Sequence, residues 1–294
     1  MATLQGHAIP LAGVLGKLAD HTYVTCTGGH AWPCWGRSAG GKVICSGTGS
    51  SEQAECISKP ESHAGLIYAV TGVCHQTANR ILWPARVLVT AAKGYWISSL
   101  LYGTYGRGAA EWAALRAGCR GLSGEIPDCM VPRMDLTEVP ETGPDESRYV
   151  EQVQALYAQT PATGEELNMR AMPQQGDALL NQDLTLLASY RIQAGEGSKQ
   201  VKDLIDLRDE FYVRKSRLDG LVQMDQISVA GYVEEANAGV VNFQQGCQDI
   251  LGDDDYTQLT GLKPGETVTL IDPEIAAKTL GRGGPAPAPT PGKM

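Results

Sequence analysis

Cys74 is the residue whose position most strongly favours chemistry. It comes soon after a glycine turn at Gly72 and begins a run of residues with helical character. The first N–H groups of a helix have no partner within the helix, and the helix dipole is positive at that end. A thiol held there is shifted towards the reactive thiolate, as in many cysteine hydrolases. The opposing interpretation is a small core residue, because free cysteines are among the most buried residue types.

A cysteine nucleophile needs a nearby base, usually histidine, and a group that orients this base. The sequence contains five histidines, which are His7, His21, His30, His63 and His75. His75 is a poor partner, because adjacent side chains of a helix point about 100° apart. His21 opens a predicted strand, and His30 follows a double-glycine turn. We therefore expect one of these two to face Cys74 across a contact between a sheet and a helix.

The first 120 residues have the composition of an α/β region. We expect short strands at 22–26 and 42–45, a polar loop at 46–62, and a strand or short helix at 64–70. A helix should begin near Cys74, because residues that suit a core recur there at helical spacing. These residues are Cys74, Ala78, Ile81 and Ala85.

The rest of the chain changes character after a proline-rich stretch. Residues 121–146 contain four prolines and are the best candidate for a linker. Residues 147–280 are predicted to form an acidic helical domain, and residues 281–294 a disordered tail of proline and glycine that cannot pack a core. The expected helices cover residues 146–160, 177–194, 201–222 and 225–251.

The order of a histidine strand before a cysteine helix resembles the circularly permuted papain-like hydrolases of the NlpC/P60 superfamily. Two segments carry this resemblance, Asp20-His21-Thr22-Tyr23-Val24 and Gly72-Val73-Cys74-His75-Gln76, and it covers about residues 18–95. The resemblance implies an α+β protein with a papain-like N-terminal domain over residues 1–120. The helical residues that follow would be an added lid, a substrate-docking region or a partner-binding domain.

The same resemblance assigns roles to three residues. Cys74 would attack an amide, peptide or thioester carbonyl, His21 would act as the general base, and the backbone N–H of Cys74 would stabilise the oxyanion. His30 is the choice for the third, orienting residue. The expected activity is therefore that of a cysteine amidase or peptidase-like hydrolase, with an amide-containing substrate and no cofactor.

Two alternatives remain open at this stage. The first is a tetrahedral zinc site formed by His21, Cys26, His30 and Cys34, although their spacing matches no strong zinc pattern. A strand at 22–26 would also direct the side chains at positions 21 and 26 to opposite faces. The second is a non-enzymatic binding or assembly protein, with structural cysteines and with helices that bind a partner or a second copy.

Charge and apolar patterning exclude two classes of partner. The first 125 residues carry ten Lys and Arg against six Asp and Glu, and the others fourteen against twenty-seven. Neither half has a cluster of basic residues, and the acidic half would repel phosphates, so no nucleic-acid binding is expected. The most apolar stretch, residues 81–102, is interrupted by charged residues, proline and glycine, so no membrane span is expected.

Eight cysteines and the N-terminal residues lead to an expectation about the compartment. No basic and apolar export signal is visible at the start, so we expect a cytoplasmic protein, with signal-independent export as an open alternative. In a long chain of this kind, buried free thiols are expected rather than disulfides. The cysteines are Cys26, Cys34, Cys45, Cys56, Cys74, Cys119, Cys129 and Cys247.

Overall fold

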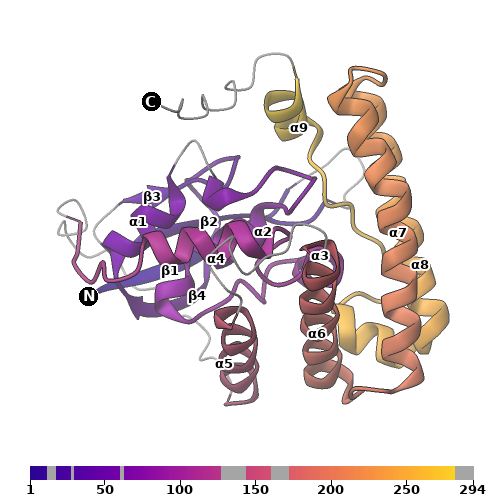
Figure 1. Cartoon of the computed structure of the whole chain (residues 1–294), viewed down its shortest axis with the longest axis horizontal. Helices are drawn as coiled ribbons and strands as arrows, with labels where there is room; N and C mark the ends of the chain where they lie inside the picture. Colours follow the sequence, from indigo (N-terminus) through magenta and orange to yellow (C-terminus); the bar gives the residue numbers. More distant parts are fainter. Residues whose placement is uncertain (12–17, 28–29, 60–62, 127–143, 160–171, 282–294) are drawn as a thin grey trace.

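The chain has an α+β fold (Figure 1). The computed structural model describes residues 1–11, 18–27, 30–59, 63–126, 144–159 and 172–281. The strands are β1 (Ala2–Ile9), β2 (His21–Cys26), β3 (Ala31–Trp32) and β4 (Lys42–Gly49). The helices are α1 (Ser51–Ser58), α2 (Cys74–Ile81), α3 (Tyr95–Tyr102), α4 (Ala109–Gly118), α5 (Pro144–Ala158), α6 (Met172–Ile192), α7 (Lys199–Gln223), α8 (Val229–Thr260) and α9 (Pro273–Leu280). Two short 3₁₀ turns are η1 (His63–Gly65) and η2 (Trp83–Ala85).

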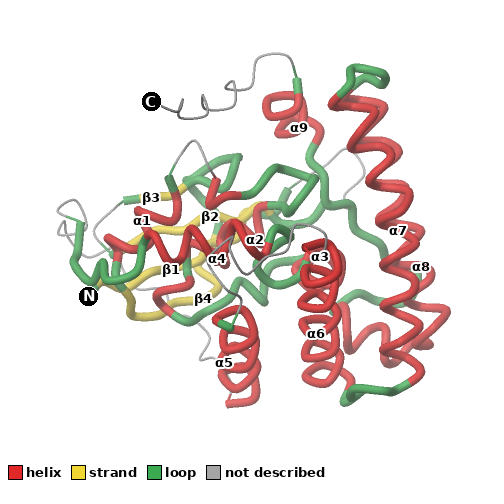
Figure 2. Tube along the Cα trace, viewed as in Figure 1, coloured by secondary structure: helices red, strands yellow, loops and turns green. Residues whose placement is uncertain are grey.

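The four strands form one antiparallel sheet in the order β3-β2-β1-β4 (Figure 2). β1 is an inner strand that pairs with both β2 and β4, and most of its residues are buried. Its Gly6 lies where a side chain would not fit, because a Cβ atom would come within 2.6 Å of Cys45 Sγ and 2.9 Å of Val89 Cγ1. The glycine therefore allows the segment after α2 to pack directly on the sheet.

Helix α2 is the central helix of the N-terminal part and packs against β2. All eight of its residues are buried, including five polar ones, and of these five side chains only Thr77 lacks a hydrogen-bond partner among the described residues. Asn79 donates to Thr104 O at 2.8 Å, and Arg80 donates to three carbonyl oxygens. These bonds tie the loops around α2 to the helix and fix its position.

Helices from the C-terminal half of the chain pack against the N-terminal α+β part. One buried core cluster runs from β1 and β2 through α2 and α3 to α6 and α8. Asp183 on α6 is buried and accepts hydrogen bonds from Thr104 N at 2.6 Å and Tyr157 OH at 2.7 Å. The same core cluster therefore includes residues on both sides of the predicted linker at 121–146.

After α8 the chain returns to the sheet. The segment that follows Gly261 runs back beside the N-terminal part, where Ala19 N donates to Thr269 O at 2.9 Å (Figure 1). This contact joins residues 250 positions apart and brings α9 to the end of β2 at which His21 lies.

Two expectations about local structure were wrong. Residues 46–62 were expected to form a loop, but β4 continues to Gly49 and α1 follows, with Ser50 capping its first turn through Gln53 N at 3.1 Å. The N-terminal strand β1 was not expected at all. The predicted strands at 22–26 and 42–45, the helix from Cys74 and the four later helices are all present, within a few residues at most ends.

Disulfide bonds correct the expectation of free thiols. Cys56 of α1 and Cys119, just after α4, are joined with their Cα atoms 5.8 Å apart. Cys26 is disulfide-bonded as well. Cys34, Cys45, Cys74 and Cys247 are free and buried. The sequence carried no sign of the pairing, because its partners are distant in the chain and meet only through the fold.

Some expectations fall on residues that are not described. The predicted linker at 121–146 is described only up to 126 and from 144, where α5 begins. The predicted tail at 281–294 lies outside the described residues except for Gly281. Among the helices of the described ranges, none is both long and apolar enough to cross a membrane.

The disulfide provides a first test of the fold. Replacement of both cysteines in a Cys56→Ala/Cys119→Ala variant should lower the free energy of unfolding by about 4 kcal/mol, because the bond closes a long loop in the unfolded chain. Urea unfolding followed by circular dichroism measures this change. A Cys45→Ala/Cys247→Ala variant is the matched control, since it removes two buried thiols without removing the cross-link. Equal losses in the two variants would contradict the predicted role of the bond.

Candidate active site

A tight turn and a helix start place Cys74. Ala69 has a left-handed backbone with φ of 63°, and its N–H donates to Gly72 O at 2.8 Å. The side chain of Gln76 then accepts a hydrogen bond from Val73 N at 3.1 Å, which caps the first turn of α2. Cys74 is the first residue of this helix, as the sequence predicted.

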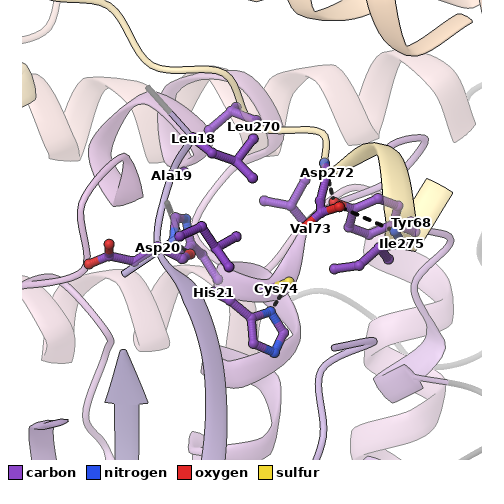
Figure 3. A pocket seen from close by; sticks show the side chains of 12 residues that line it. Leu18, Ala19, Asp20, His21, Tyr68, Val73, Cys74, Leu270, Asp272 and Ile275 are labelled. Carbon is purple, nitrogen blue, oxygen red and sulfur yellow. Dashed lines mark hydrogen bonds between the residues drawn. The ribbon is translucent and has the colours of Figure 1, made fainter. Parts of the chain in front are cut away.

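His21 is brought to Cys74 by the contact between β2 and α2. It is the first residue of β2 and pairs with Ile9 of β1. Its Nδ1 atom lies 3.0 Å from Cys74 Sγ (Figure 3). Sulfur and nitrogen are therefore within hydrogen-bond distance, although 53 positions separate the two residues.

The other ring nitrogen of His21 is also bonded. Its Nε2 lies 2.8 Å from the carbonyl oxygen of Arg37, which can only accept a hydrogen bond, so the proton of a neutral ring belongs on Nε2. Nδ1 is then free to accept the thiol proton of Cys74. Gly36 packs against the ring, and a Cβ atom there would lie 2.5 Å from the Cε1 atom of His21. A backbone carbonyl and a glycine thus hold both the tautomer and the position of the imidazole.

The expectation that His30 orients His21 is wrong. Both nitrogens of His21 are bonded elsewhere, one to Cys74 and one to the Arg37 carbonyl. His30 instead lies beside Glu55, with 3.2 Å between Nε2 and Oε2, and its ring lies edge-on to Trp32. Sequence reasoning required a polar side chain in the third position, whereas the structure uses a backbone group there.

His75 points away from the thiol, as helix geometry predicted. Its Nε2 lies 3.0 Å from Asp20 O and its Nδ1 2.8 Å from Ser98 Oγ. Burial is the main cause that lowers the pKa of His75, to about 4. His75 is therefore a neutral histidine that joins α2 to the start of β2 and to α3.

Burial also decides the charge state of the candidate pair. Burial, helped by the nearby Asp272 carboxylate, raises the pKa of the Cys74 thiol to about 12, against the lowering effect of backbone hydrogen bonds from Thr22 and from Cys74 itself. Burial likewise lowers the pKa of His21, against an opposing effect of the hydrogen bond to Arg37 O. The expectation of a thiolate at the helix start is wrong for this arrangement, because desolvation outweighs the helix N-terminus. The resting pair is a neutral thiol and a neutral imidazole.

A small pocket surrounds the pair (Figure 3). Cys74 is only 6% exposed and His21 only 3%. The returning C-terminal segment forms one wall, where Asp272 N donates to Tyr68 OH at 2.8 Å. The residues that line the pocket are Leu11, Leu18, Ala19, Asp20, His21, Tyr68, Val73, Cys74, His75, Leu270, Asp272 and Ile275.

The proposed zinc ligands do not converge. His21 bonds to Cys74, Cys26 is held in a disulfide, and His30 pairs with Glu55. In the described ranges, no three side chains of His, Cys, Asp or Glu are grouped so that they could hold a metal ion. The zinc alternative is therefore wrong for His21, Cys26, His30 and Cys34.

Three features of the site were missed from the sequence. The Arg37 carbonyl carries no signal, since every residue has such a group. Tyr68 lies in a stretch that was expected to be a strand or a short helix, with no reason to assign it to the site. Asp272 lies nearly 200 positions after Cys74, and its only signal is the Asp-Pro pair that starts α9 with an aspartate cap.

Comparison with known proteins adds no assignment, because no family model, curated protein or solved structure matches the chain. The resemblance to circularly permuted papain-like hydrolases therefore stays a prediction. It rests on the order of His21 and Cys74 along the chain and on their contact.

The buried state of His75 predicts how stability depends on pH. Its folded pKa of about 4 lies below the value for an unfolded chain, so its contribution is complete above about pH 6.5 and is lost as pH falls through 4. The loss should reach about 3 kcal/mol, from about 2.5 pH units at 1.36 kcal/mol each. Urea unfolding at pH 7 and at pH 4 measures it.

A His75→Gln variant should lose less stability than the wild type between these two pH values, since glutamine does not titrate. His30→Gln is the control for replacement of a histidine and should keep the wild-type pH dependence. An equal pH-dependent loss in His75→Gln and the wild type would show that His75 is not held neutral in the folded protein.

Proposed function

We propose that this protein is a cysteine hydrolase or transferase that acts on an amide, peptide or thioester bond, with Cys74 as nucleophile and His21 as base. The observation that carries this proposal is the 3.0 Å contact between Cys74 Sγ and His21 Nδ1. The Arg37 carbonyl supports it, because it leaves Nδ1 as the nitrogen able to accept a proton.

The first half of the reaction transfers the acyl group to the enzyme. The thiol proton of Cys74 moves to His21 Nδ1 as Sγ bonds to the carbonyl carbon and the π-electron pair moves onto the carbonyl oxygen. The backbone N–H of Cys74, in the first turn of α2 at the positive end of the helix dipole, would stabilise this oxyanion. The bond to the leaving amine or thiol then breaks, and His21 returns its proton to the leaving group.

The second half releases the acyl group. A water molecule attacks the thioester carbon as His21 takes a proton from the water, and the C–S bond then breaks as His21 returns that proton to Sγ, which restores the thiol and the neutral imidazole. In a transferase, an amine or other acceptor would replace the water. During both halves the Arg37 carbonyl accepts a hydrogen bond from Nε2 and so stabilises the transient imidazolium.

The neutral resting pair suits this general-base route. A preformed thiolate–imidazolium pair would have to carry two charges in a buried site, and burial opposes both of them. Proton transfer that accompanies attack avoids a free thiolate. A papain-like arrangement of the N-terminal part belongs to the same proposal, because a strand that begins with histidine packs on a helix that begins with cysteine.

The compartment in which the protein acts also belongs to the proposal. Cytoplasmic residence was the expectation, and the Cys56–Cys119 disulfide is an observation against it. Disulfides persist in oxidising surroundings and are rare where thiols are kept reduced. We therefore favour action in an oxidising compartment.

A non-enzymatic role remains the second candidate, and one observation favours it. The buried Cys74 thiol, with its pKa raised to about 12, is unreactive in the closed arrangement. In that case Cys74 is a core residue, and helix α7 together with the acidic helix α8 provides the functional surface for a protein partner or a second copy.

Replacement of the pair distinguishes the two candidates. Cys74→Ala and His21→Gln should each lower turnover of a panel of peptide anilides and thioesters by at least about 1000-fold, because each removes a reacting group. Intact-mass spectrometry of the wild type should detect an acyl group that is absent from Cys74→Ala. Cys247→Ala is the matched control, since it removes a buried free thiol of α8 and should keep full activity.

Retention of wild-type turnover by Cys74→Ala would exclude the enzymatic role that we assign to this residue. A loss of turnover that Cys247→Ala shares would instead reveal a general effect on folding. The free energy of unfolding, measured for each variant, separates these outcomes.

A further inference from the structure

The C-terminal segment closes the pocket in which Cys74 and His21 meet. Leu270, Asp272 and Ile275 form a wall of this pocket (Figure 3). Attack on a carbonyl requires the reacting atoms to approach to about 3–3.5 Å. Since Cys74 is only 6% exposed, no substrate reaches its sulfur while this wall is in place.

The part of the segment before Asp272 is firmly anchored to α8. The side chain of Gln244 makes two hydrogen bonds with the backbone of Val268. It accepts one from Val268 N at 2.9 Å and donates one to Val268 O at 2.7 Å. Asn237 holds the N–H of Leu270 and both backbone groups of Ile271, at 2.9–3.2 Å. These five hydrogen bonds hold the segment before Asp272 on α8, so this part of the wall is a fixed element of the fold.

Helix α9 is held differently. Ile275 and Ala276 are buried, and Leu280 is partly buried, so apolar contacts attach the helix. Within the described part of the chain, no hydrogen bond or ion pair links residues 273–280 to anything beyond Asp272 and the helix itself. A short helix attached by a few apolar side chains can detach at a lower free-energy cost than residues 268–271, the anchored strap that precedes it.

Asp272 lies at the junction between these two parts and faces the site. Its N–H donates to Tyr68 OH, and its Oδ1 caps α9 by accepting from Glu274 N and Ile275 N. Its negative charge also raises the pKa of the Cys74 thiol and so disfavours the thiolate. The junction therefore combines a contact inside the pocket, the start of the movable helix and a charge that suppresses the nucleophile.

We propose that α9 is an inhibitory plug over the Cys74–His21 pair, and that it swings away about Asp272 to admit the substrate. This inference rests on the proposed function, since a plug regulates only a site that reacts. The anchored strap stays on α8 during this movement, and α9 uncovers the pocket as Ile275 leaves it.

The test measures access to the thiol directly. Residues 275–280 are replaced by an equal length of glycine and serine in the full chain, and Cys74 is labelled with iodoacetamide and followed by peptide mass spectrometry. We expect labelling of Cys74 to be at least about tenfold faster than in the wild type, because the opening equilibrium no longer limits it. Ile275→Ala should accelerate labelling by a smaller factor.

Two controls isolate the plug. Lys278→Ala alters an exposed position of the same helix, and deletion of residues 283–294 removes only the chain beyond it. Both should label Cys74 at the wild-type rate. Urea unfolding verifies that each variant remains folded. If the glycine–serine variant does not fold, Ile275→Ala and amide hydrogen exchange of the wild type take its place, with faster exchange expected in α9 than in α8.

The outcomes separate this inference from the proposed function. Labelling of Cys74 that stays at the wild-type rate in both folded α9 variants would overturn the plug. Protection of α9 amides equal to that of α8 would also overturn it. Faster labelling without turnover of any amide or thioester would uphold the plug as a cover over the thiol and count against the enzymatic role.

Discussion

The hydrogen bond between a buried thiol and a buried imidazole is the interaction on which the candidate site depends. Neither group can be charged in this place at low cost, so each must have its polar atoms satisfied by groups that do not move. The Arg37 carbonyl meets this need for His21, and Gly36 leaves room for its ring. Cys74 in turn is fixed by the start of α2. The pair is therefore rigid and neutral, with a single direction for proton transfer.

The surrounding fold serves this constraint by bringing distant segments together. β1 lies in the interior of the sheet, and its pairing with β2 fixes the position of β2. The buried polar residues of α2 bind the loops that flank the helix. The later helices add a second support, because α8 carries the two amide side chains that hold the returning strap. One continuous core results, in which the same packing that positions Cys74 also covers it. Stability and access to substrate thus oppose each other, and a detachable α9 would resolve that opposition.

Strand composition and helical periodicity in the sequence narrowed the partner of Cys74 to His21 or His30, and the family resemblance then favoured His21 as the base. The sequence could not identify the groups that complete the site. The Arg37 carbonyl has no residue-type signature. Asp272 reaches the site only because the chain returns there, in a contact between Ala19 and Thr269 that joins residues 250 positions apart. β1 was missed because Gly6 weakens its strand pattern, although tight packing requires a glycine there. The charge state was also misjudged, since a helix start favours a thiolate only where solvent or a cation supports it.

The protonation of the His21 ring tests the central claim most directly. Nitrogen-15 NMR of labelled histidine at pH 7 reports which ring nitrogen carries the proton and whether the ring is charged. We predict a neutral His21 ring with its proton on Nε2, and an Nδ1 resonance that shifts when Cys74 is replaced by alanine. A proton on Nδ1, a charged ring, or an Nδ1 resonance indifferent to Cys74→Ala would contradict a thiol that donates to this nitrogen.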